Sequence, residues 1–113
     1  MIKIINPHRI PDMKNHHGVS LRKLYDSEYS QVLQINLLPG EKVKRHITAV
    51  HVLFYILEGT GIVEIGNDRA EVSAEMLIES PPNLPHRFIN DGNVPFRFLV
   101  VKTLRPGEDT EIQ

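Results

Sequence analysis

The segment HITAVHVLFYILEGTG, from His46 to Gly61, holds side chains that are well suited to chemistry. It places His46 and His51 at the start of an apolar run that ends in a Glu-Gly-Thr-Gly turn. A neutral imidazole binds transition-metal ions, and it also serves as a hydrogen-bond partner in a pocket without metal. A third histidine, His86, closes a proline-rich stretch, SPPNLPH. The residue types alone leave both chemistries open.

The elements that must position these histidines are predicted to be short strands, because no window keeps a helical apolar period. Within residues 33–37, Leu and Ile alternate with Gln and Asn, which is the period of two of a strand. We expect strands at residues 19–25, 29–38, 50–57, 62–65, 69–72, 76–78, 86–90 and 96–103, after a short apolar start at residues 2–5. This spacing predicts an all-β fold, a single closed antiparallel sandwich or barrel.

The composition is that of one ordinary globular domain. The chain has 113 residues, of which 41% are hydrophobic and 24% are charged with both signs interspersed. A net charge of -1 gives no electrostatic reason to expect nucleic acid or an anionic membrane surface as a partner. Without cysteine, disulfides and thiolate metal sites are excluded. No apolar segment suggests a secretory signal or a membrane span, so we expect a cytoplasmic protein.

A first motif resembles one of the two signature motifs of the cupins, a family of small jelly-roll β-barrels. The family pattern is Gly, five spacers, His-x-His, three or four spacers, Glu, six spacers and Gly. Gly40, His46 and Gly59 match this pattern, whereas Thr48 and Val52 occupy the second histidine and glutamate positions. This motif therefore retains the glycines typical of the fold, but only one of the three side chains that bind metal in the family.

The second cupin motif resembles residues 75–90. In the family a glycine precedes Pro-x-Gly, two spacers, a histidine, three spacers and an asparagine. Pro81, His86 and Asn90 match in register, while Glu75 and Asn83 replace the two glycines. The resemblance runs from about residue 38 to residue 104. It implies a single antiparallel jelly-roll β-barrel, the double-stranded β-helix.

The resemblance also implies a metal centre, because cupins hold one metal ion with the histidines and the glutamate of these motifs. His46 and His86 are retained, and His51 is the expected third protein ligand if the backbone bulges to turn it inward. Imidazole ligands suit a divalent transition metal such as Zn, Fe, Mn, Ni or Cu. Strict alternation predicts instead that Val52 points inward and His51 outward. A third reading is a pair of polar histidines in the core, with no metal.

Two functions follow from this resemblance. The first is a small-molecule metalloprotein that binds a sugar or a small oxygenated compound in the barrel cavity, with isomerase or dioxygenase-like enzymes as the model. The alternative is a metal-free binding or sensing module with a degenerate site. The fold hosts both kinds of protein, so the sequence leaves open whether the chain is an enzyme.

The remaining polar candidates are expected to lie away from the cavity. Strand alternation places Arg45 and Arg87 on the face opposite to His46 and His86, in solvent or at a subunit contact. The adjacent histidines in the polar stretch of residues 11–18 are expected to be solvated loop side chains.

We also predict a homodimer, because the strand at residues 96–103 is apolar on both faces and one barrel interior covers only one of them. The apolar start at residues 2–5 would add to a neighbour's sheet edge. The expected organisation is an N-terminal arm and polar loop at residues 1–18, the barrel at residues 19–105 and a tail at residues 106–113.

Overall fold

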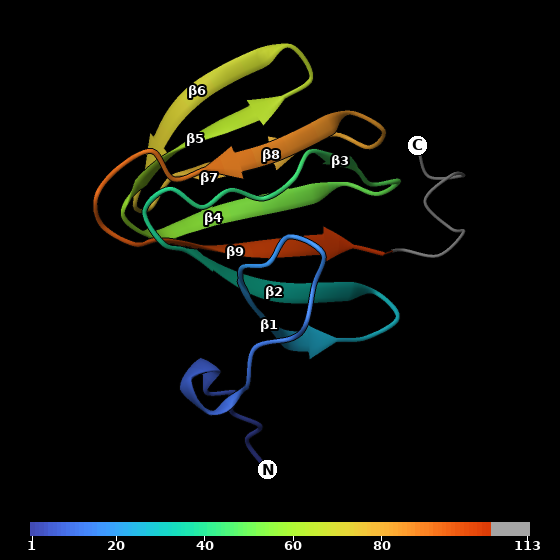
Figure 1. Cartoon of the computed structure of the whole chain (residues 1–113). Coiled ribbons are helices and arrows are strands. Elements are labelled where there is room, and N and C mark those ends of the chain that lie inside the picture. The colour runs from blue at the N-terminus through green and yellow to red at the C-terminus, as the bar shows by residue number, and fades with distance from the viewer. Residues whose placement is uncertain (105–113) are drawn as a thin grey trace, which may run out of the picture.

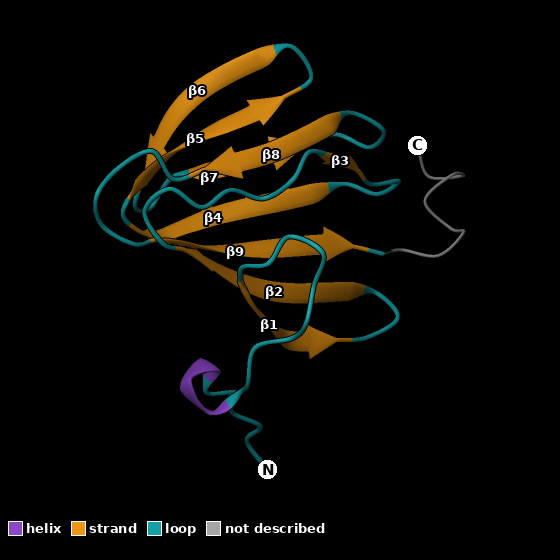
Figure 2. Cartoon of the chain, viewed as in Figure 1, coloured by secondary structure: helices purple, strands orange, loops and turns teal. Residues whose placement is uncertain are grey.

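The computed structural model describes residues 1–104, which form two antiparallel sheets preceded by a short 3₁₀ helix (Figure 1). The elements are η1 (Pro7–Arg9), β1 (Ser20–Asp26), β2 (Ser30–Leu37), β3 (His46–Ile47), β4 (Val52–Glu58), β5 (Thr60–Ile65), β6 (Asp68–Ser73), β7 (Leu77–Ser80), β8 (Pro85–Ile89) and β9 (Phe96–Thr103). The all-β prediction is confirmed, since loops and strands make up nearly all of the described chain (Figure 2).

The sheets have the strand orders β1-β2-β9-β4-β7 and β3-β8-β5-β6. Each neighbouring pair is antiparallel, but no strand pair within residues 1–104 joins one sheet to the other. The closed barrel expected from the sequence is therefore corrected to two open sheets. The sheets do not close because β3, with two residues, and β7, with four residues, are too short to continue a hydrogen-bonded ladder from one sheet to the other.

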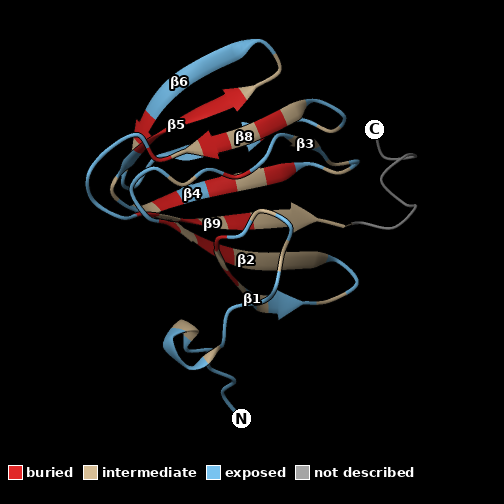
Figure 3. Ribbon diagram, in the orientation of Figure 1, coloured by how far each residue is buried: buried red, intermediate tan, exposed pale blue. Residues whose placement is uncertain are grey.

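The core lies between the sheets, and on β4, β8 and β9 buried residues alternate with more exposed ones (Figure 3). On β4, Val52, Phe54 and Ile56 are at most 2% exposed, which confirms the period of two. Phe88 of β8 stacks on Phe98 of β9 with ring centroids 4.3 Å apart, so aromatic packing joins the two sheets. Burying each such side chain contributes about 1.5–3 kcal/mol.

Residues 2–5 form no strand within the single chain, and their addition to a neighbour's sheet edge stays a prediction. Ile2 and Ile4 are 84% and 80% exposed, and the chain then turns at Asn6, whose side-chain oxygen accepts a hydrogen bond from the His8 N–H. That cap begins η1, which directs the chain away from an extended course. Leu99 and Val101 of β9 alternate with the buried Phe98 and Val100 and are partly exposed. This second apolar face is the one that a partner would cover, and the homodimer stays a prediction.

Within residues 1–104, the structure contains no helix with the length and apolar character that crossing a membrane requires. The tail expected at residues 106–113 lies outside the described residues.

Candidate functional site

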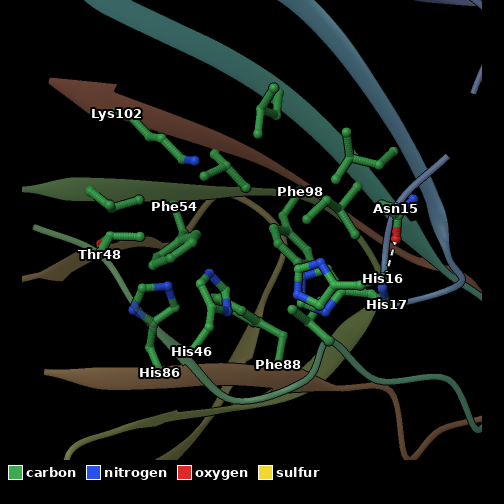
Figure 4. A pocket seen from close by; sticks show the side chains of 16 residues that line it. Asn15, His16, His17, His46, Thr48, Phe54, His86, Phe88, Phe98 and Lys102 are labelled. Atoms are coloured by element: carbon green, nitrogen blue, oxygen red, sulfur yellow. Dashed lines mark hydrogen bonds between the residues drawn. The ribbon is translucent and has the colours of Figure 1, made fainter. Parts of the chain in front are cut away.

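A cavity of about 210 Å³ lies between the two sheets and is walled mainly by apolar side chains (Figure 4). The apolar lining residues are Leu21, Leu33, Ile35, Val43, Val52, Phe54, Phe88, Phe98 and Val100. Its polar lining consists of Asn15, His16, His17, His46, Thr48, His86 and Lys102. A mostly apolar pocket with a few convergent polar groups is the usual form of a small-molecule site.

His46 and His86 meet across the β3–β8 ladder, where they are direct partners in the register. Their ring centroids are 4.4 Å apart and their planes meet at 69°. The His86 residue is only 3% exposed, and its ring lies 5.4 Å from the Phe54 ring. The prediction that these two histidines converge on one cavity is confirmed.

His17 is a cavity residue that the sequence analysis placed in solvent, so that prediction is wrong. The Lys44 N–H donates to His17 Nδ1 at 2.9 Å, which fixes the N-terminal loop against the segment before β3. The His17 ring centroid is 5.4 Å from that of His46. Asn15 shapes the loop, because its Oδ1 accepts the His17 N–H at 3.0 Å. The residues Asn15 and Gly18 are typical of a turn, but this local signal does not show where the loop lies.

The backbone of Lys44 fixes the two imidazoles in opposite tautomers. His46 Nδ1 lies 3.0 Å from the Lys44 carbonyl oxygen, which only accepts, so this nitrogen donates and Nε2 of neutral His46 is an acceptor. His17 Nδ1 accepts the Lys44 N–H, so Nε2 of neutral His17 carries the proton and is a donor. The cavity rim therefore offers one imidazole acceptor and one imidazole donor.

The imidazoles of His86, which is buried, and His17, which is partly buried, are neutral near pH 7. Burial lowers the pKa of His86 to about 4, and the His46 imidazole and the Lys102 ammonium act in the same direction. Burial likewise lowers the pKa of His17 to about 4, with His16, His46 and Lys44 adding to it. Desolvation disfavours the charged form of a base, which explains the direction of both shifts.

We expect the protein to lose stability as the pH falls from about 6.5 towards about 4. In that window unfolded histidine takes up a proton, whereas buried His86 does not, so protons favour the unfolded chain. Stability is then highest above pH 6.5. The difference between the pKa of unfolded histidine and that of buried His86 corresponds to at most about 3 kcal/mol of stability. Solvent screening reduces this contribution to about 1–2 kcal/mol. Thermal unfolding followed by circular dichroism at pH 7.5 and pH 4.5 measures it.

His86→Gln provides the comparison for this pH dependence, because the variant cannot take up the proton. Its melting temperature should depend less on pH than that of the wild-type protein. His51→Gln is the matched control, since the His51 side chain is 57% exposed. Equal pH dependence in wild type and His86→Gln would show that His86 is not the group responsible.

His51 does not share the cavity with the other two predicted ligands. Its Nδ1 lies 3.7 Å from Glu79 Oε2 on the outside of the sheet, so strand alternation, and not an inward bulge, sets its direction. Within residues 1–104, no group of three or more His, Asp or Glu side chains has a spacing that would hold a metal ion.

The arginines next to the candidate histidines have a partner that sequence reasoning missed. Arg45 Nη2 and Arg87 Nε donate to Glu64 Oε1 at 2.9 and 2.7 Å, and Arg69 pairs with the other carboxylate oxygen. The Arg87 guanidinium is the largest influence that lowers the pKa of Glu64. Both arginines lie on the face opposite to the histidines, as expected, where they bind β5.

The chain matches a family model described as the Cupin domain over residues 33–102, which is more than half of its length. It belongs to the cupin family. The match contains the first motif with His46 and the second with His86, so the resemblance of these two segments is confirmed.

The chain is also similar in sequence to a curated protein over part of its length. An uncharacterized protein of Methanocaldococcus jannaschii, MJ1618, is 39% identical over 69 residues, which are 60% of this chain and 54% of that protein. The chain thus spans about half the length of the curated relative that it matches.

Solved structures show the same fold. A predicted oxalate decarboxylase of Thermotoga maritima has a TM-score of 0.81 and 21% identity, over 90% of this chain and 99% of that chain. The polyketide cyclase RemF of Streptomyces resistomycificus has a TM-score of 0.81 and 22% identity, over 95% and 83%. At these identities the likeness concerns the fold alone.

The side chains of this cupin do not fit the metal centre of the family. Thr48 and Val52 stand where the second histidine and the glutamate are expected, and the exposed His51 replaces neither. The charge of the lining is also unsuitable, because Lys102 contributes an ammonium and no described lining residue contributes a carboxylate. The Lys102 ammonium repels a metal cation, and the described lining offers no carboxylate to offset that repulsion.

Proposed function

We propose that this cupin binds a small oxygenated molecule in the cavity between its sheets, with His46 and His86 as direct polar partners and without a resident metal. The observation that carries this proposal is the convergence of these two imidazoles on a cavity of about 210 Å³ that is otherwise mainly apolar. Neutral imidazole donates and accepts hydrogen bonds, so it suits a hydroxyl or a carbonyl group of the ligand.

Binding is favoured over acid–base catalysis by the composition of the cavity lining. A histidine that acts as general base is normally oriented by an acidic group, and the described lining residues include no carboxylate.

The first test is metal analysis of untagged protein by mass spectrometry, together with ligand-observed NMR using xylose, phenol and benzoate as probes. We expect well under one equivalent of metal, and binding of at least one probe that is lost in His46→Ala and His86→Ala. His51→Ala is the matched control, because this exposed histidine lies outside the cavity lining.

Two results would overturn the proposal. One equivalent of a transition metal that disappears in His46→Ala and His86→Ala would establish the alternative, a metalloprotein with these ligands. Failure of all three probes to bind the wild-type protein would remove the cavity from consideration as a site for small oxygenated molecules.

A further inference from the structure

Lys102 is the one formal charge among the described residues that line the cavity. It follows Phe96, Phe98 and Val100 on the inward face of β9, and Figure 4 shows its ammonium nitrogen turned toward the other lining side chains. Within residues 1–104 no ion pair joins it to a carboxylate. A partly buried ammonium beside apolar walls gains from a counter-charge, because burial removes water from it.

The register places Lys102 directly opposite Val52. Val52 occupies the position at which the first cupin motif carries its glutamate, so the family's carboxylate would stand next to this ammonium. In this chain the acid is missing and the cation is present. The cavity therefore has the opposite charge from one built to hold a metal cation, and an anionic group of a ligand would complete it.

We infer that the cavity selects a small monocarboxylate with an apolar body, whose carboxylate pairs with Lys102. This inference rests on the proposed function and names the ligand class for the same site. The aromatic rings of Phe54 and Phe98 line the cavity and would cover the apolar body, while His46 and His86 remain for an oxygen of the ligand. One ammonium balances one carboxylate, so a compact dianion without an apolar part is a poor ligand here.

Isothermal titration calorimetry with two matched pairs of probes tests the charge requirement: benzoate against benzamide, and hexanoate against hexanamide. Each pair shares its shape and differs in charge. The titrations contain EDTA, so that metal cannot mediate binding. We expect at least one carboxylate to bind ten-fold or more tightly than its amide, since a desolvated charge pair contributes more than a neutral contact.

Substitutions at the charged position locate the effect. Lys102→Met should weaken binding of the carboxylate about ten-fold while the amide changes little, and Lys102→Arg should retain most of the affinity. Lys42→Met is the matched control, because this exposed lysine lies outside the cavity lining. Val52→Glu places a protein carboxylate opposite Lys102 and should abolish carboxylate binding, with circular dichroism confirming that the variant is folded.

The outcomes separate this inference from the proposed function. Equal affinity for carboxylate and amide, or unchanged carboxylate binding in Lys102→Met, would overturn the monocarboxylate inference and leave the binding cavity in place. Binding of none of the four probes to the wild-type protein would overturn the inference, and with the earlier probe set the proposed function as well.

Discussion

Replacement of Gly59 by alanine should lower the free energy of unfolding by about 3–5 kcal/mol, most of the stability of a marginally stable small domain. Gly59 has φ +86, a left-handed conformation that costs a residue with a Cβ about 1–2 kcal/mol. A Cβ at this position would also overlap the Pro95 carbonyl oxygen and lie 3.1 Å from Phe96 Cα. Both neighbours are backbone at the start of β9, so neither moves without disturbing the strand. Chemical unfolding followed by circular dichroism measures the change.

Gly40→Ala is the matched control for this effect. Gly40 has φ +88, but a Cβ there meets nothing within 4 Å, so only the conformational cost of about 1–2 kcal/mol remains. The difference between the two variants isolates the steric overlap with Pro95. If both alanine variants lose the same stability, close packing at Gly59 does not contribute.

The strands were predictable because their signals are local. Alternation of side chains identifies β2 and places Val52, Phe54 and Ile56 inside, and turn residues mark most of the boundaries. β3 escaped prediction since its two residues show no period. Closure of the sheets depends on pairing between strands distant in sequence, which no local pattern encodes.

The candidate site was predictable only where a motif fixed the spacing. His46 and His86 were placed together because turns at fixed positions present both, and the structure pairs them in register. His17 comes from a loop that reaches the cavity with a long-range hydrogen bond from the Lys44 N–H, which no local pattern encodes. Lys102 belongs to no motif. Its place in the site follows from the strand register, which sets it opposite Val52.

Replacement of Asn90 by alanine should cost about 3–5 kcal/mol, because it removes three hydrogen bonds from a side chain with no exposed surface. Asn90 Nδ2 donates to the Leu37 carbonyl at 2.9 Å and to the Val94 carbonyl at 2.8 Å, and its Oδ1 accepts the Gly92 N–H at 3.0 Å. These bonds join the end of β2 to the loop between β8 and β9. Alanine would leave the buried Leu37 carbonyl without its partner, which costs about 1–3 kcal/mol. It would also remove the bonds to Val94 and Gly92, which are exposed residues, and each of these bonds contributes about 0.5–1.5 kcal/mol.

The exposed loop residue Asn93 supplies the control, since Asn93→Ala should change the free energy of unfolding by no more than about 0.5 kcal/mol. Urea unfolding of both variants compares them directly. Asn90 also ends the strand that carries His86, four residues earlier, so a destabilised Asn90→Ala variant should bind benzoate more weakly than Asn93→Ala does. An Asn90→Ala variant as stable as Asn93→Ala would mean that the three bonds do not hold β8 to β2, and that another contact positions His86.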